Sequence, residues 1–169
     1  MSDVETLITE MTARARAAGR SLGRASDAEK AAALKSAAAA LRGQADMIMA
    51  ANALDMEAGE KAGLSGAMLD RLKLDAGRIK GISAAVDQVA ALADPVGQVI
   101  DSHAQPNGLV MERVRVPIGV LGIIYESRPN VTADAAALGL RSGNAVILRG
   151  GSEAVNSNRA IHAAMVEGI

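Results

Sequence analysis

The chain has 169 residues, of which 50% are hydrophobic and 22% are charged, and its formal net charge is −1. This length and apolar content predict a folded protein with one domain or two small ones, and the balanced charge argues against nucleic acid and anionic membranes as partners. Cysteine is absent, which excludes disulfides, thiolate metal sites and thiol nucleophiles from this chain.

Residues 1–95 have the spacing of amphipathic helices. Apolar residues recur at intervals of three and four between Val4 and Leu22, so they lie along one face of a first helix. Ser26 and Glu29 have the spacing of a capping box and begin a second helix. A third stripe follows Gly43, and its members are Met47, Ile48, Ala51, Leu54 and Ala58.

A fourth helix is predicted between Asp75, a suitable cap, and Pro95, which stops it. Its apolar face contains Ile79, Ile82, Val86, Val89 and Leu92. The methionines are interpreted as flexible core filler. The first half of the chain is therefore predicted to form a helical layer.

Residues 96–116 predict a β-hairpin. Turn-forming residues at 105–108 separate two strand-like segments. In the second segment, Val110, Val114 and Val116 point to one side while Arg113 and Arg115 point to the other, as in a half-exposed ribbon. Such a ribbon is expected to contact a second subunit.

Residues 117–169 predict a βαβ unit. The uninterrupted apolar run from Ile118 to Tyr125 is typical of a strand covered on both faces. A helix capped by Asn130 follows, and residues 145–148 form a second buried strand, which the crossover makes parallel to the first. The fold class is therefore α/β, with a helical layer, a hairpin and the start of a Rossmann-like parallel sheet.

The loop at residues 126–130 follows the first of these strands, at the strand end where such sheets bind ligands. Arg128 is suited to a carboxylate or phosphate, and Asn130 to donating an N–H to a developing oxyanion. The alternative is that Asn130 only caps the helix and that Arg128 is a solvated surface charge.

The loop at residues 149–153 follows the second strand, and we expect both loops to face one crevice. Gly150 and Gly151 allow a ligand to approach the backbone, and Ser152 is predicted to cap the next helix, so phosphate or ribose is a candidate ligand. The pattern matches neither G-x-G-x-x-G nor a Walker loop, and an ordinary strand-to-helix turn explains it equally well.

The segment 113–158 resembles the signature segment of the gamma-glutamyl phosphate reductase family, within the aldehyde dehydrogenase superfamily. The stretches Tyr-Glu-Ser-Arg-Pro-Asn at 125–130 and Leu-Arg-Gly-Gly-Ser-Glu at 148–153 carry this resemblance, and the helical start and hairpin extend it to the whole chain. It implies that residues 1–95 are the helical part of the cofactor-binding domain, 96–116 an oligomerisation arm and 117–169 the first βαβ unit of an NADP-binding domain.

The resemblance implies an oxidoreductase of proline biosynthesis that reduces L-glutamyl 5-phosphate with NADPH to L-glutamate 5-semialdehyde and phosphate. The family uses a cysteine nucleophile. Because this chain has no cysteine, we expect a fragment that lacks the catalytic domain and is inactive alone. The alternatives are a nucleotide-binding module without chemistry and an oligomerisation module whose loops are only caps.

The resemblance also assigns roles to the two loops. Asn130 matches the oxyanion-stabilising asparagine, and Arg128 and Asn130 are expected to contact the substrate. The residues expected to bind NADPH are Tyr125, Glu126, Ser127, Arg149, Gly150, Gly151, Ser152 and Glu153.

The location and the metal content follow from what the sequence lacks. No apolar run reaches the roughly 20 residues of a membrane span, and the start lacks a secretory signal, so the cytoplasm is expected. The two histidines, His103 and His162, are far apart in the sequence, and no metal site is predicted.

Overall fold

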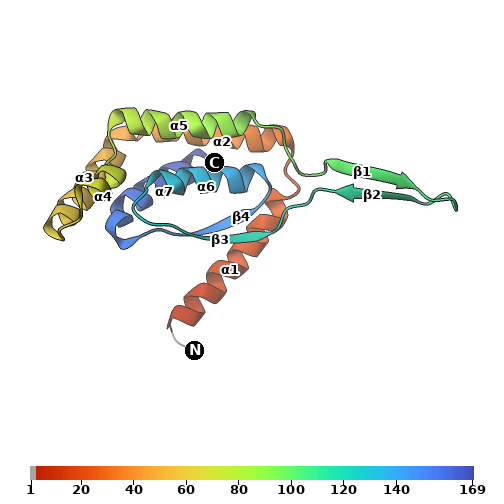
Figure 1. The fold of residues 1–169 in the computed structure, drawn as a ribbon, viewed down its shortest axis with the longest axis horizontal. Coiled ribbons are helices and arrows are strands. Elements are labelled where there is room, and N and C mark those ends of the chain that lie inside the picture. Colours follow the sequence, from red (N-terminus) through yellow and green to blue (C-terminus); the bar gives the residue numbers. More distant parts are fainter. Residues whose placement is uncertain (1–2) are drawn as a thin grey trace.

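The structure, a computed structural model, describes residues 3–169, and Figure 1 shows their arrangement. Helices come first: α1 (Asp3–Leu22), α2 (Asp27–Gly43), α3 (Ala45–Lys61), α4 (Gly66–Leu72) and α5 (Ala76–Ala91). A hairpin follows, with strands β1 (Val99–Ala104) and β2 (Val110–Val114). The rest comprises β3 (Val120–Ile124), α6 (Asn130–Arg141), β4 (Ala145–Arg149), the short 3-10 helix η1 (Ser152–Ala154) and α7 (Val155–Gly168).

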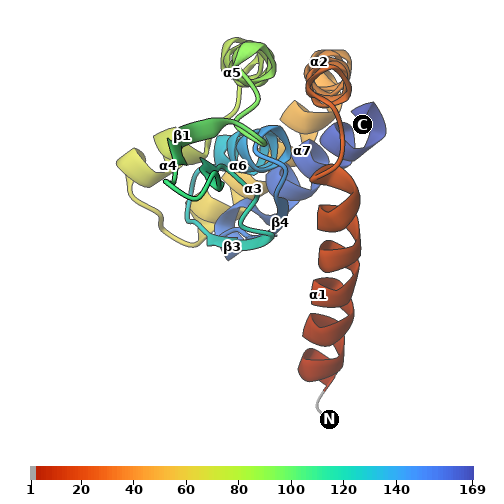
Figure 2. The same cartoon turned by 90° about the vertical axis from the view of Figure 1, so that its right-hand side faces the viewer.

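The core lies between helices. In the two views α2 and α5 form an upper layer, α6 and α7 lie beneath them, and the sheet of β3 and β4 lies lower still (Figures 1 and 2). Small residues let the helices approach closely: a Cβ on Gly168 of α7 would lie 2.5 Å from the Cα of Ala37 of α2. Fully buried members of this core include Leu34, Ala38, Leu41, Val86, Ala133 and Ile161.

The two small sheets have the predicted directions. Strands β3 and β4 are parallel, with Val120 opposite Ala145 and Ile124 opposite Arg149. Strands β1 and β2 are antiparallel. The prediction that β3 is covered on both faces is wrong for residues 3–169, because Ile124 is 76% exposed. As the last residue of β3, Ile124 faces solvent.

The hairpin differs from the predicted half-exposed ribbon. Every residue of β2 is exposed, so both faces of the ribbon are open to solvent. Figure 1 shows the reason: β1 and β2 project away from the helices and the other sheet. The same view and Figure 2 show that α1 also extends from the body, and none of its residues is buried.

Helix α3 buries a different face from the one predicted. Its buried residues are Ile48, Asn52, Asp55 and Gly59, whereas Met47 is 62% and Leu54 58% exposed. The interpretation of the methionines as core filler is therefore wrong for Met47. The reason is that α7 offers hydrogen-bonding partners to Asn52 and Asp55, so the polar side of α3 faces inward.

The sequence pattern does not predict helix α4. Its seven residues are too few to show a helical period, and the hydroxyl of Ser65 caps it by accepting a hydrogen bond from the N–H of Met68 at 3.4 Å. The consequence for function is large, because α4 lines both pockets described below.

Two buried cations, Lys30 and Arg141, bind the segment that follows α5. The ammonium of Lys30 in α2 lies 2.7 Å from the carboxylate of Asp94, and their side chains are only 1% and 13% exposed. Arg141 of α6 donates to the carbonyl of Leu92 at 2.8 Å and also pairs with Asp27. Burial raises the pKa of the Asp94 carboxyl, but hydrogen bonds from Lys30 and the N–H of Val96 outweigh this effect and lower the pKa below its ordinary value.

Replacing Asp94 with alanine is expected to lower the free energy of unfolding by about 3 kcal/mol, because it leaves Lys30 buried without a counter-ion. The lowered pKa means that this contribution is fully present above the ordinary aspartate pKa and is lost as the pH falls through the lowered value. Denaturant unfolding between pH 2 and 7 measures both effects. The control is Asp87→Ala, which removes an exposed pair with Arg42 and should cost no more than about 1 kcal/mol. Equal losses for the two variants would refute the assignment.

Candidate functional site

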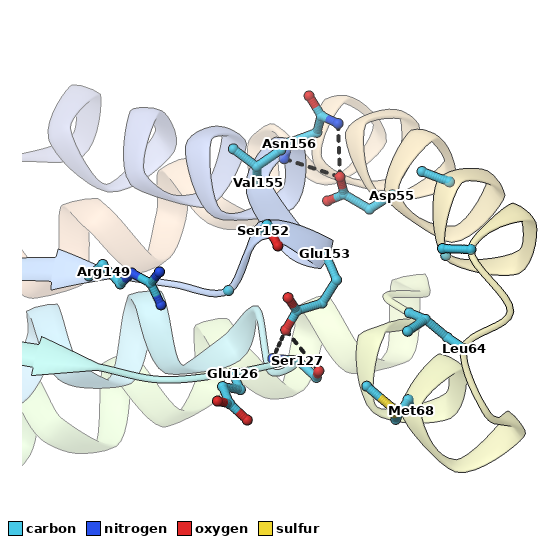
Figure 3. Close-up of a pocket in the computed structure, with 14 residues that line it drawn as sticks. Asp55, Leu64, Met68, Glu126, Ser127, Arg149, Ser152, Glu153, Val155 and Asn156 are labelled. Carbon is cyan, nitrogen blue, oxygen red and sulfur yellow. Dashed lines mark hydrogen bonds between the residues drawn. The ribbon is translucent and has the colours of Figure 1, made fainter.

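A pocket of about 580 Å³ opens where β3 and β4 end (Figure 3). One wall comes from the two loops after these strands and contains Glu126, Ser127, Arg149, Gly151, Ser152 and Glu153. The facing wall comes from α3, the segment after it and α4, and contains Asp55, Ala58, Gly59, Ala62, Leu64 and Met68. Val155 and Asn156, at the start of α7, complete it.

Hydrogen bonds tie the two loops together. The backbone N–H of Tyr125 donates to the carbonyl of Arg149 at 3.1 Å, which continues the pairing of the parallel strands. Beyond it, the Glu153 carboxylate accepts the N–H of Ser127 at 2.5 Å and its hydroxyl at 2.8 Å (Figure 3). The expectation that the loops meet in one crevice is therefore met by Glu126, Ser127, Arg149 and residues 151–153.

Ser127 has an unusual backbone that these bonds hold in place. Its φ of 40° lies in the left-handed region, which costs a residue with a side chain about 1 kcal/mol. The Glu153 carboxyl accepts hydrogen bonds from the backbone N–H of Glu153 itself and from Ser127, and the charge of Arg149 lies nearby. These effects outweigh burial and lower the pKa of the Glu153 carboxyl. The carboxylate thus stays ionised as the acceptor that holds the loop.

Side chains lie close to both glycines of the second loop. A Cβ on Gly151 would lie 2.2 Å from Oε1 of Glu153 and would displace the carboxylate from Ser127. A Cβ on Gly150 would lie 2.1 Å from Nδ2 of Asn158. Gly150 is not among the residues that line the pocket.

Tyr125 also lies outside the pocket lining. Its hydroxyl is 2.6 Å from the hydroxyl of Thr132, and the latter donates to Asn158 at 3.1 Å. Tyr125 therefore connects the first loop to α6 and α7 through these hydrogen bonds. Six of the eight residues predicted to bind the cofactor line the pocket, and Tyr125 and Gly150 do not.

The cap of α7 comes from α3 and not, as predicted, from Ser152. Ser152 makes no capping hydrogen bond, and it begins η1. Asp55 accepts the N–H of Asn156 at 3.2 Å, and the N–H and hydroxyl of Ser157 at 2.7 and 2.6 Å. A carboxylate of the chain thus occupies the amides at the start of α7, where helices commonly bind phosphate. Asn52 and Asp55 interrupt an apolar stripe of α3, and that interruption is the signal that could have identified them.

Arg128 and Asn130 line a second pocket, of about 390 Å³, with residues from α4, the α4–α5 turn and α5. Pro129 precedes the helix as its cap, and the side-chain amide of Asn130 donates to Asp134 at 2.9 Å. The alternative in which Asn130 caps α6 is therefore wrong. The expected single crevice does not include Arg128 and Asn130, because the loop 126–130 separates two neighbouring pockets.

Two kinds of feature are absent from residues 3–169. No three side chains among histidine, aspartate and glutamate come together there as a metal-binding group. Within the same part of the chain, every helix is too short or too polar to cross a membrane.

Known proteins resemble this chain over nearly all its length, although no family model matches it. It is 65% identical, over 99% of its residues, to a gamma-glutamyl phosphate reductase of Sphingopyxis alaskensis. The crystal structure of a gamma-glutamyl phosphate reductase from Thermotoga maritima matches 95% of the chain with a TM-score of 0.92 and 45% identity. The chain spans 39% of the length of each of these two proteins. The resemblance inferred from the sequence is confirmed.

More distant structures show the fold alone. An NAD-dependent benzaldehyde dehydrogenase from Corynebacterium glutamicum matches 91% of the chain with a TM-score of 0.69 and 20% identity. The predicted fold class, a part of the aldehyde dehydrogenase fold with a helical layer, hairpin and βαβ unit, is confirmed.

Replacing Asp55 with alanine is expected to lower the free energy of unfolding by about 3 kcal/mol, because it leaves two amides and the hydroxyl of Ser157 without an acceptor. Chemical denaturation followed by circular dichroism measures the loss. The control is Glu57→Ala on the exposed side of the same helix, where only a pair with Lys61 is removed, and its cost should stay below about 0.5 kcal/mol. A loss no larger than the control's would show that α7 does not depend on this cap.

Proposed function

We infer that this chain belongs to the gamma-glutamyl phosphate reductase family, and we propose that it forms part of the NADPH-binding region of such an enzyme. The proposed reaction reduces L-glutamyl 5-phosphate with NADPH to L-glutamate 5-semialdehyde and phosphate, in proline biosynthesis. The similarity to the reductases covers 99% of the chain. The observation that carries the proposal is the pocket at the ends of β3 and β4, beside which Asn130 lines a second pocket.

The first pocket fits the adenosine end of a dinucleotide. Its volume of about 580 Å³ lies within the range of small-molecule sites. Leu64 and Met68 provide an apolar wall for a base, Gly151 lets a ligand approach the backbone, and Glu153 provides a carboxylate for ribose hydroxyls (Figure 3). The side chain of Arg149 is exposed and forms no hydrogen bond or ion pair within residues 3–169, so its charge is available to the 2′-phosphate of NADPH.

NADPH, when bound, supplies the hydride. The proposed roles of this chain are to bind and to orient. Asn130 uses one side-chain N–H to bind Asp134, and an amide nitrogen carries a second N–H for the carbonyl oxygen of the substrate as negative charge develops on it. Arg128 contacts an anionic group of the substrate.

The same proposal assigns a role to each segment of the chain. Residues 1–95 are the helical part of the cofactor-binding domain, and residues 117–169 are its first βαβ unit. The proposed role of these residues is to bind ligands. The thiol nucleophile that the family resemblance implies is not among them, because this chain contains no cysteine. The cytoplasm is the proposed location.

The hairpin 96–116 is proposed to join a second copy of the chain. It projects from the body, and both of its strands are exposed (Figure 1). Its apolar side chains are correspondingly open to solvent, with Val110 59%, Met111 53% and Val116 76% exposed. An open ribbon edge with apolar side chains favours association.

A nucleotide-binding module without chemistry is the second candidate. The first pocket, which has carboxylates and a cation on its lining, is the observation that favours it. Both candidates require NADPH binding, and only the reductase assignment requires Asn130 to matter for turnover in a cysteine-containing relative.

NADPH is expected to bind this chain, without substrate turnover, as measured by the fluorescence of the reduced nicotinamide. Arg149→Gln should weaken binding about tenfold, because it removes a charged partner of the 2′-phosphate. Arg159→Gln, on an exposed position of α7 outside the pocket, is the control and should bind as the unchanged chain does. The proposal is wrong if NADPH does not bind or if the two variants bind it equally.

Self-association is expected to increase with concentration in sedimentation-velocity experiments. Val110→Lys should shift the population toward monomer, because it places a charge on the open face of the ribbon. Val166→Lys is the control, since this valine is 60% exposed on α7, away from the hairpin. Association that is unaffected by Val110→Lys would exclude the hairpin as the interface.

A further inference from the structure

The second pocket is strongly cationic. Its lining includes Arg71 and Lys73 from the end of α4 and the turn after it, Arg78 from α5, and Arg128 from the loop after β3. Asp70 is the carboxylate on this lining. Four cations facing one carboxylate leave an excess of three positive charges in a pocket of about 390 Å³. A surface of this kind attracts an anion and not a neutral ligand.

One of these cations, Arg78, forms an ion pair and hydrogen bonds within the chain. The guanidinium of Arg78 lies 2.8 Å from the carboxylate of Asp70 and donates to the carbonyl of Lys73 at 2.8 Å. These contacts neutralise Asp70 and hold the turn between α4 and α5. Arg78 therefore serves to position the turn that carries Arg71 and Lys73.

The side chains of the other three cations form no such bonds within residues 3–169. Arg71, Lys73 and Arg128 are exposed, and no hydrogen bond or ion pair joins their side chains to any other part of residues 3–169. They come from two segments more than fifty positions apart in the sequence, which the fold brings to one pocket. Like charges repel one another, so an anion between them would relieve an unfavourable arrangement.

We propose that Arg71, Lys73 and Arg128 form a subsite for the phosphoryl group of the substrate. This inference rests on the proposed function, since it names the part of the acyl phosphate that the second pocket binds. Asn130 lines the same pocket, so the acyl oxygen and the phosphoryl oxygens of one ligand have donors on adjacent walls.

The substrate has two anionic groups, and their charges indicate which of them binds the three cations. A phosphoryl group carries close to two negative charges and several acceptor oxygens, whereas the α-carboxylate of a glutamyl compound carries one charge beside an ammonium. Two guanidinium groups and an ammonium match the phosphoryl group better, because each guanidinium can bind two of its oxygens. Inorganic phosphate, the proposed product, has the same chemistry and should bind the same subsite.

The experiment titrates the chain with inorganic phosphate at constant ionic strength and follows backbone amides by ¹H–¹⁵N NMR. We expect saturable shifts at the amides of residues 71–73, Arg128 and Asn130. The double variant Arg71→Gln, Lys73→Gln should weaken phosphate binding at least tenfold. The control Lys80→Gln changes an exposed residue of α5 outside the pocket and should bind phosphate unchanged.

Two further titrations separate the possible outcomes. Glutamate at the same concentrations should shift these amides much less, and an equal response would overturn the phosphoryl assignment. NADPH should shift residues 149–153. Phosphate binding without NADPH binding supports the subsite and refutes the cofactor pocket, whereas NADPH binding without a phosphate response at 71–73 refutes the subsite and leaves the proposed function standing.

Discussion

The carboxylate of Asp55 accepts the amides that begin α7, although about a hundred residues of chain separate the two. A helix begins with amides that lack partners inside the helix, and here another helix supplies the acceptor. Asn52, one turn earlier, donates to Ser157 and to the carbonyl of Leu72 and accepts the N–H of Leu74. These bonds hold α3, α4 and α7 in one arrangement, and the walls of both pockets depend on it.

The same carboxylate affects how charge is distributed between the pockets. It occupies the positive end of α7, where a phosphate would otherwise be favoured. In the first pocket Glu126 and Glu153 add negative charge, and Arg149 is the cation on its lining. The second pocket has the opposite excess. The second pocket is therefore the better electrostatic match for a compact anion, whereas the first offers carboxylates to hydroxyl groups and Arg149 to a single phosphate.

The loop from Glu126 to Asn130 separates these pockets, and its backbone explains how five residues serve both. Ser127 adopts a left-handed conformation that Glu153 stabilises through two hydrogen bonds. The chain reverses there, so residues on either side of the bend face different pockets. A substitution that freed Ser127 from Glu153 would alter both pockets together.

Apart from α4 and η1, the sequence alone determined the order of the elements, together with the parallel βαβ unit and the positions of the two loops, because helical periods, apolar runs and turn residues are local features. It did not determine which face of α3 is buried, which residue caps α7, or that Arg128 and Asn130 face a different pocket from Arg149. Those outcomes depend on partners distant in the chain. Only the tertiary structure brings Asp55 to α7 and Arg71 to Arg128, because burial, capping and electrostatic pairing are set by neighbours in space.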